Sequence, residues 1–336
     1  MSNKRFGCFP MVVTFILCTS LFLNLLLLIW GSRSTASSKL SFVTQTVPDL
    51  DETVVTGGSS TEKIALLPIR GVITSGAIGS AGESMVEDFK LALRQAVNDK
   101  AVKAIVLAID SPGGEVTAAD TIYQAVVKAR EKKPIVIYMG SMAASGGYYI
   151  ACGGSFLMAS DTSITGSIGV IIETLNYQQL LGKIGVEAVV FKSGKFKDIL
   201  SGSRPMTQDE KDFVQRMVMQ TYDKFVGIVA KERKIPEDYL RQNIADGRIV
   251  SGRDALEQKL INGIGQIEDA YEKARQLGKA PGASVVRYEG RMKFGKLLRF
   301  FGTGSEHAQI QLNLTESFLP KLEAGKLYLL PSFYAP

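Results

Sequence analysis

Three short segments of the sequence contain residue types that could carry out nucleophilic catalysis, and the first surrounds a serine. Residues 140–148 read GSMAASGGY and lie between an apolar run and a stretch of small residues. A serine at such a strand-to-helix turn lies near helix N-terminal amides, which can stabilise developing negative charge. The glycines and alanines would let a substrate backbone approach closely. A tight helix of small residues packed against a sheet would give the same pattern and stays open.

The second segment, DSPGG at residues 110–114, follows the apolar run 102–109. Ligands of open α/β folds bind at the carboxyl ends of the strands. Consecutive glycines there can present backbone N–H groups to an oxyanion. A plain turn before a helix is the alternative.

The third segment, FKSGKFKD at residues 191–198, carries three lysines. A lysine that acts as a general base must be neutral near pH 7, so its pKa must fall from its usual value of about 10.4 by about 3. Desolvation between apolar walls can lower it that far. Lysines on a solvated surface, which remain charged, are the alternative.

Composition excludes several other chemistries. The only histidine is His307, so a zinc site built on two or three histidines and a helical HExxH motif are excluded. A Ser-His-Asp site would have to use His307. The cysteines are Cys8, Cys18 and Cys152, which are too few for a disulfide framework or a cysteine-rich metal site.

Apolar periodicity predicts alternating strands and helices from residue 63 onward. Nearly continuous apolar runs indicate buried parallel strands, predicted over 64–69, 102–109, 135–139, 156–159, 168–172 and 186–191. Helices are predicted over 84–97, opened by a Ser84-x-x-Glu87 capping box, and over 116–130, 143–151, 177–184, 207–234, 255–260 and 270–277. This order indicates βαβ units over a mostly parallel sheet.

Four motifs occur in a characteristic order: DSPGG, GSMAASGGYY, TGSIGV at 165–170 and SGKFKD. Together they resemble the signal peptide peptidase A family of membrane-anchored Ser-Lys serine peptidases. Residues 246–252 (DGRIVSG) and 255–261 (ALEQKLI) are similar to the family's C-terminal segments, so the resemblance covers about residues 62–280. The implied fold is α/β, with Clp protease/crotonase-like ββα-type units around a mostly parallel sheet, preceded by one N-terminal transmembrane helix.

The resemblance implies a catalytic dyad. The family's nucleophile corresponds to Ser145, whereas Ser141 is not at that position. The base corresponds to Lys197, because the family pattern Gly-x-aromatic-Lys reads GKFK at 194–197. Lys192 and Lys195 do not fit that register.

The remaining site residues follow from the same resemblance. By similarity to the related Clp protease fold, the amides of Gly114 and Gly146 would hold the oxyanion. Ser167 would orient the lysine. A Clp-like histidine is missing from residues 168–172, which agrees with a lysine base. No cofactor and no metal are expected.

The resemblance implies a serine endopeptidase that hydrolyses hydrophobic peptides, such as signal-peptide remnants released during secretion. A non-catalytic membrane scaffold or regulator on the same fold is an alternative, although its signature would be loss of Ser145 or Lys197. A crotonase-like acyl-CoA enzyme is another. For that enzyme, an acyl-CoA pool outside the membrane would be unexpected.

The N-terminus predicts membrane anchoring. Residues 11–30 are almost wholly apolar, and twenty helical residues span about 30 Å, the thickness of a bilayer core. Lys4 and Arg5 place residues 1–10 in the cytoplasm by the positive-inside rule. We therefore expect a single-pass protein of the cell membrane with its catalytic domain outside the cytoplasm. A cleaved signal peptide is the alternative.

The rest of the chain is divided by composition. Residues 31–61 are expected to form a flexible linker, 62–284 the peptidase domain and 285–336 a C-terminal extension. The net charge of +6 and a basic, apolar segment at 291–301 fit an anionic membrane surface or a helix packed on the body. No nucleic acid partner is expected.

Two expectations concern assembly. A double-length version of the family carries its lysine and serine in different halves of a duplicated chain. This chain holds one copy, which implies a homo-oligomer with active sites shared between subunits. The uncharged tail 327–336 is expected to bind in the chain's own active site, or else to pack at a subunit interface.

Overall fold

The computed structural model describes residues 19–22, 50–76, 84–289 and 328–329. The chain divides into two compact units, residues 1–48 and 49–336. Of the expected transmembrane helix 11–30, only residues 19–22 are described, and they are helical; the remainder lies outside the described residues, as does segment 291–301. No helix within the described ranges combines the length and apolar character needed to cross a bilayer.

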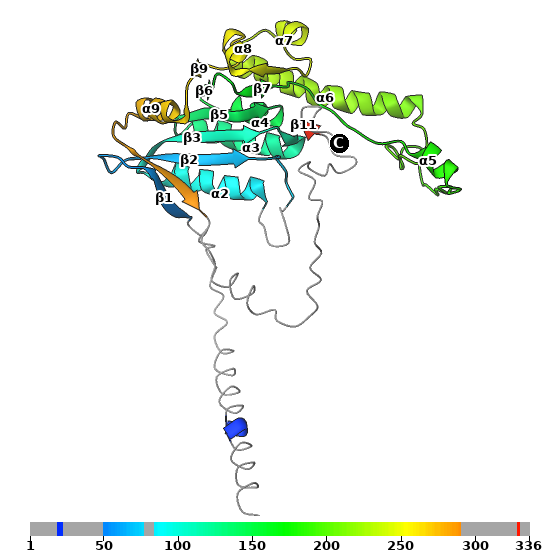
Figure 1. Ribbon diagram of the computed structural model, residues 1–336, viewed down its shortest axis with the longest axis horizontal. Coiled ribbons are helices and arrows are strands. Elements are labelled where there is room, and N and C mark those ends of the chain that lie inside the picture. The colour runs from blue at the N-terminus through cyan, green and yellow to red at the C-terminus, as the bar shows by residue number, and fades with distance from the viewer. Residues whose placement is uncertain (1–18, 23–49, 77–83, 290–327, 330–336) are drawn as a thin grey trace, which may run out of the picture. The chain divides into compact units, whose positions relative to one another are not determined.

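The second unit is built on a mostly parallel sheet, as the sequence predicted (Figure 1). Its strands run in the order β1-β10-β2-β3-β5-β6-β9, and β7 and β8 extend it beside β5. Only the pairs β1–β10 and β7–β8 are antiparallel within this sheet. The bounds are β1 Asp51–Thr56, β2 Lys63–Arg70, β3 Val102–Ser111, β5 Ile135–Ala144, β6 Phe156–Ala159, β7 Ile164–Gly166, β8 Ile249–Ser251, β9 Gly263–Ile264 and β10 Ser284–Glu289.

The central strands are apolar at most positions because both faces of the sheet are covered. In β2, Ala65 and Leu67 belong to a core cluster that includes residues of α2, α3 and α4, whereas Ile64 and Leu66 belong to a second cluster with α9. The helices are α2 Met85–Asn98, α3 Val116–Arg130, α4 Gly146–Ala151, α5 Gln178–Lys183, α6 Gln208–Arg233, α7 Glu237–Asn243, α8 Gly252–Glu257 and α9 Ile267–Gly278.

Two helix starts differ in their capping. At α6, the Thr207 hydroxyl accepts from the Glu210 backbone N–H and the Glu210 carboxylate accepts from the Thr207 backbone N–H, which closes a capping box. The box predicted for α2 does not form. Ser84 is the N-cap but makes no side-chain cap hydrogen bond, and Glu87 pairs with Lys90 instead.

The structure differs from the sequence prediction in several elements. Strand β1 lies in the stretch 31–61 that was expected to be a linker, and β10 crosses the predicted boundary at residue 285. Strands were predicted at 168–172 and 186–191, but neither forms. Only Ile171 makes an isolated bridge. β-Branched residues form a strand only when a neighbouring strand pairs with them, and residues 186–191 are exposed, with no partner strand in the described ranges.

The turn after β5 is also placed differently from the prediction. A helix was predicted over 143–151, but Ala143 and Ala144 pair with β7 as the end of β5. Helix α4 begins only at Gly146. Ser145 is therefore the single residue between a buried strand and a helix.

Candidate active site

Ser145 occupies a strained and buried turn between β5 and α4. Its φ of 53° and ψ of −112° are unfavourable for a residue with a side chain. The residue is 0% exposed. Both of its backbone polar groups are hydrogen-bonded: its N–H donates to the Gly166 carbonyl at 2.9 Å, and its carbonyl accepts from the Tyr149 N–H at 2.8 Å. Its Oγ is buried and has no hydrogen-bond partner within the described part of the chain. Strain and an unpaired buried hydroxyl both cost stability, and such features concentrate at functional sites.

Glycines from two segments converge beside this turn. Gly113 and Gly114 have positive φ values of 112° and 159°. A Cβ atom placed on Gly146 would lie 3.2 Å from the Gly114 backbone nitrogen, so the two predicted oxyanion residues are neighbours. A Cβ atom on Gly113 would lie 2.7 Å from the Gly146 nitrogen. Only glycine allows the backbones to meet this closely.

Ser167 lies next to Ser145 because the strands before them are paired. Ala144 of β5 is in register with Gly166 of β7, and Ser145 and Ser167 follow directly. Ser167 is buried, also has a positive φ (51°), and donates its backbone N–H to the Arg248 carbonyl at 2.7 Å. Ser145, Ser167, Gly114 and Gly146 are thus gathered in one place.

Gly113 was not among the predicted site residues, whereas the segment that covers it belongs to the tail 327–336 that was expected to bind in the active site. Strand β11 (Tyr328–Leu329) pairs antiparallel with β4 (Gly114–Glu115), and Tyr328 also exchanges two backbone hydrogen bonds with Ile171. Leu329 is 0% exposed, and its carbonyl oxygen would lie only 1.9 Å from a Cβ on Gly113. The signal in the sequence that could have identified Gly113 is its position as the first of two consecutive glycines in the DSPGG turn.

The arrangement around β11 is that of an extended peptide bound between two backbone segments. Strand addition of this kind uses main-chain hydrogen bonds for affinity and a side-chain pocket for selectivity. Here β4 and Ile171 supply the backbone partners, and the buried Leu329 side chain fills an apolar space beside Gly146. Of the expected tail 327–336, only these two residues are described.

Lys197 is not brought to Ser145 within the chain. It is exposed on the loop after α5, in an arm (residues 172–206) that extends beyond the N-terminal end of α6 (Figure 1). No hydrogen bond or ion pair of its ammonium occurs among the described residues. The two lysines outside the family register form ion pairs: Lys192 with Asp198 at 2.7 Å, and Lys195 with Asp209.

Other chemistry finds little support in the described part of the molecule. Cys152, at the end of α4, is fully buried, and burial raises the pKa of its thiol to about 12. It is therefore protonated and not a competing nucleophile at neutral pH. No group of three His, Cys, Asp or Glu residues suited to a metal ion occurs among the residues described.

Replacing Gly113 by alanine tests whether this glycine lines the substrate strand. The added Cβ would fill the position next to the Leu329 carbonyl, so we expect peptide turnover to fall by about 100-fold or more. Gly71→Ala is the matched control: Gly71 also has a positive φ, 74°, but a Cβ there meets nothing within 4 Å. Both variants should lose about 1–2 kcal/mol of stability from backbone strain, and Gly113→Ala should lose more because its Cβ would also lie 2.7 Å from the Gly146 backbone nitrogen. Equal activity losses in the two variants would contradict this role for Gly113.

Comparison with known proteins gives two family matches. The sequence pattern described as Peptidase family S49 matches residues 128–280, and that described as Clp protease matches residues 65–162. The second match accords with the mostly parallel α/β sheet observed here.

Individual relatives also have names that describe proteases or peptidases. A protein of Enterococcus faecium with the provisional name signal peptide peptidase SppA is 36% identical over 72% of this chain and 71% of its own. A protein of Methanocaldococcus jannaschii, provisionally named a protease, is 39% identical over 61% of this chain and 67% of its own. Protease 4 of Haemophilus influenzae is 33% identical over 64% of this chain but only 35% of its own length.

Proposed function

Because the chain belongs to peptidase family S49, we propose that it is a serine endopeptidase in which Ser145 is the nucleophile and Lys197 the general base. The observation that carries this proposal is the buried Ser145 hydroxyl beside Gly114 and Gly146, which has no hydrogen-bond partner among the described residues, together with the extended strand β11 that covers these glycines. A scaffold would gain nothing from this costly arrangement, and an acyl-CoA enzyme would have no required role for Ser145.

The proposed reaction proceeds by acyl transfer in two steps. Neutral Lys197 takes the proton from the Ser145 Oγ, which forms a bond to the scissile carbonyl carbon. The backbone N–H groups of Gly114 and Gly146 hold the oxyanion. The C–N bond then breaks as the lysine returns the proton to the leaving amine. Water, deprotonated by the same lysine, hydrolyses the acyl-enzyme and regenerates Ser145. Ser167 orients the lysine.

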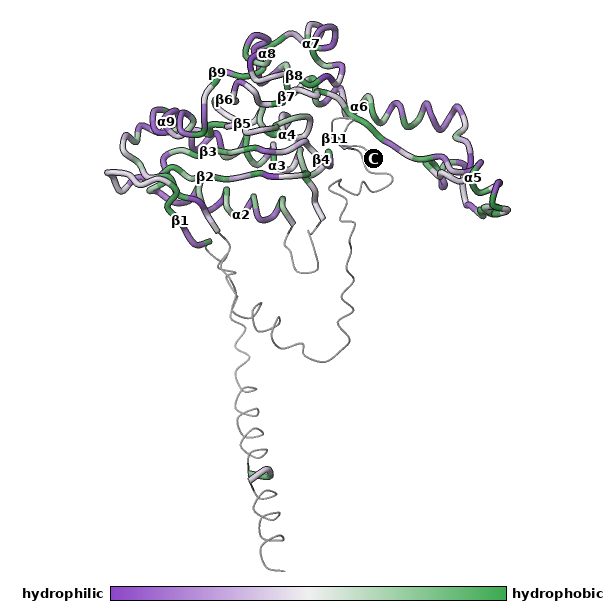
Figure 2. The backbone as a smooth tube through the Cα atoms, in the orientation of Figure 1, coloured by the Kyte–Doolittle hydropathy of each residue, from purple (hydrophilic) through white to green (hydrophobic). Residues whose placement is uncertain are grey.

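The base reaches the nucleophile, in this proposal, from a neighbouring copy of the chain. Support comes from the arm that carries Lys197: α5 buries none of its residues, and Phe191 is 95% exposed. Figure 2 shows stretches of hydrophobic residues, coloured green, along the arm. Its exposed apolar side chains are Leu175, Tyr177, Leu180, Ile184, Val186, Val189, Val190, Phe191 and Phe196.

So much exposed apolar surface is typical of an interaction site. A second copy of the chain is the partner that would also complete the dyad. Burial at such an interface would remove water from around the lysine, which favours the neutral amine form that a general base needs. The result is a homo-oligomer whose active sites are shared between subunits.

The proposed substrates are hydrophobic peptides such as signal-peptide remnants. The buried position of the Leu329 side chain indicates that the pocket beside Gly146 accepts an apolar residue. We propose that residues 11–30 anchor the protein in the cell membrane as a single span, with the N-terminus cytoplasmic and the peptidase outside. This would place the site where such remnants are produced.

The direct test of the activity is hydrolysis of a fluorogenic peptide with leucine before the scissile bond. The wild-type chain should cleave it, and Ser145→Ala should not. A folded, assembled wild-type chain that cleaves no apolar peptide would contradict the proposal and favour the scaffold.

The tail is proposed to compete with substrate, because Tyr328 and Leu329 occupy the position of an extended peptide. An attached competitor acts at a local concentration in the millimolar range. Deleting residues 327–336 should therefore raise kcat/KM for small peptides by about 10-fold. Leu329→Asp in the full chain should have the same effect, because a carboxylate is not accepted in the apolar pocket. Unchanged kinetics in both variants would count against competition by the tail.

A further inference from the structure

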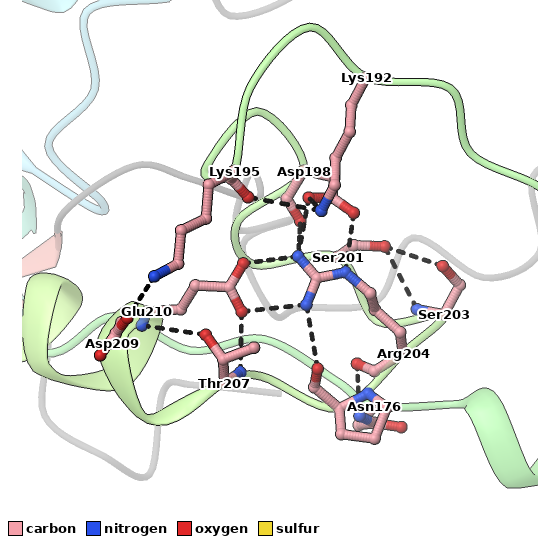
Figure 3. Close-up of polar contacts among 11 residues, drawn as sticks. Asn176, Lys192, Lys195, Asp198, Ser201, Ser203, Arg204, Thr207, Asp209 and Glu210 are labelled. Atoms are coloured by element: carbon pink, nitrogen blue, oxygen red, sulfur yellow. Dashed lines mark hydrogen bonds and ion pairs between the residues drawn. The ribbon is translucent and has the colours of Figure 1, made fainter.

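Arg204 joins the loop that carries Lys197 to the first turn of α6. Its Nε and Nη2 donate to the two carboxylate oxygens of Asp198, each at 2.7 Å. Its Nη1 and Nη2 donate to the two carboxylate oxygens of Glu210 at 2.9 and 2.5 Å. The remaining Nη1 proton is donated to the Pro205 carbonyl at 3.0 Å. Figure 3 shows this guanidinium between the two carboxylates.

We call Asp198, Arg204 and Glu210 the clamp. Its far end, Glu210, is part of a helix. Glu210 is in the first turn of α6, and its carboxylate also accepts from the Thr207 backbone N–H at 2.8 Å. Its side chain is only 2% exposed. Glu210 is thus held by both the capping box and Arg204, which makes it a rigid anchor. The near end, Asp198, directly follows Lys197 in the sequence.

The residue on the other side of Lys197 is also attached to α6. The ring of Phe196 stacks on that of Phe213, with centroids 5.5 Å apart and planes at 28°. Both neighbours of Lys197 are therefore fixed to one helix. Lys197 itself lies exposed between them, and its side chain is left available for another contact.

We infer that Arg204 is a positioning residue for the proposed base: its two bidentate contacts hold Asp198 against α6 and so set the position of Lys197. This inference rests on the proposed Ser-Lys mechanism. It requires an arginine, because only a planar guanidinium with five donors can bind two carboxylates bidentately. A lysine has three donors on one atom and cannot form both pairs.

The clamp is charged over the whole range in which a peptidase would be assayed. Arg204 lowers the pKa of Glu210 to about 2 and, together with Lys192, lowers that of Asp198 below its usual range. A carboxylate with a depressed pKa contributes its full stabilising free energy at any pH above its ordinary pKa. That contribution is lost only as the pH falls through the depressed pKa. Any change in the pH profile near neutrality therefore reports on the base and not on titration of the clamp.

The test measures kcat, KM and the pH profile of the full chain with Arg204→Gln and Arg204→Lys. Displacing a catalytic group by about 1 Å costs up to about 100-fold in rate, so we expect kcat to fall by about 10- to 100-fold with KM little changed. The apparent pKa that governs activity should also move. Arg241→Gln is the matched control, because Arg241 likewise joins two carboxylates, Asp223 and Glu237, but lies on α7, away from the Lys197 loop.

The same substitution in a Lys197→Ala chain separates positioning from general damage. With an activated ester as substrate, residual hydrolysis by Lys197→Ala should not fall further when Arg204→Gln is added. An equal fall in both backgrounds, or normal kcat and pH profile in Arg204→Gln, would overturn the inference. If Lys197→Ala itself retained normal peptide hydrolysis, the proposed mechanism would fail first, and the inference with it.

Discussion

Replacing Ser145 by alanine is expected to abolish peptide hydrolysis while leaving the fold intact or slightly more stable. Loss of a serine nucleophile typically lowers kcat by about 10⁴-fold or more. The usual penalty of a polar-to-apolar change is absent here, because the Oγ makes no hydrogen bond in the described part of the chain. Removing a buried, unpaired hydroxyl should stabilise the protein by about 1 kcal/mol. Turnover and thermal unfolding measured on the same preparation check both results.

Lys197→Ala should lose activity to a similar extent because the proposed mechanism takes the serine proton with Lys197 alone. Lys195→Ala is the matched control: Lys195 belongs to the same loop, but it pairs with Asp209 on the surface, so its loss should leave activity nearly unchanged. If Lys195→Ala were inactive and Lys197→Ala active, the base would be misassigned. A Ser145→Ala chain that kept wild-type turnover would exclude the serine mechanism altogether.

The sheet was predictable because its strands are buried on both faces. Runs such as residues 102–109 and 135–139 are apolar at almost every position, and short runs of this kind between turn residues are typical of fully buried strands. Strand β1 was missed because all six of its residues are exposed, so neither alternation nor a continuous apolar run marks it. The antiparallel contact with β10 creates it, and that contact joins opposite ends of the unit.

The site was predictable only in part, for a physical reason. Ser145, Gly114 and Gly146, which the family resemblance identified, follow buried strands or glycine-rich turns, and the structure brings them together; their catalytic roles stay predictions. The predicted strand at 186–191 failed because its β-branched residues have no partner strand among the described residues. The apolar residues of the arm are exposed for the same reason, since no described segment of the chain covers them.

This exposed arm leads to a second large effect, recovery of activity by mixing two inactive chains. In the single chain, Ser145 is buried and Lys197 is exposed on the arm without a contact to it. Suppose that each site takes Ser145 from one subunit and Lys197 from its neighbour. A Lys197→Ala chain then still supplies an intact Ser145, and a Ser145→Ala chain still supplies an intact Lys197. Random assembly of equal amounts then makes about one quarter of the sites intact.

The mixture needs a control for assembly and one for chance recovery. Different affinity tags on the two chains, used in succession, isolate oligomers that contain both. Mixing Ser145→Ala with the double variant Ser145→Ala/Lys197→Ala gives oligomers of the same kind without any intact serine, so no activity should return. This pair differs from the test pair only in the residues that would form the dyad.

The measurement that tests the central claim most directly is the peptide hydrolysis of purified mixed oligomers of Ser145→Ala and Lys197→Ala. A shared Ser-Lys site predicts recovery of about one quarter to one half of wild-type turnover, depending on the subunit number, from two chains that are each inactive. Mixed oligomers that remain inactive would contradict the shared site and place Ser145 and its base within one chain.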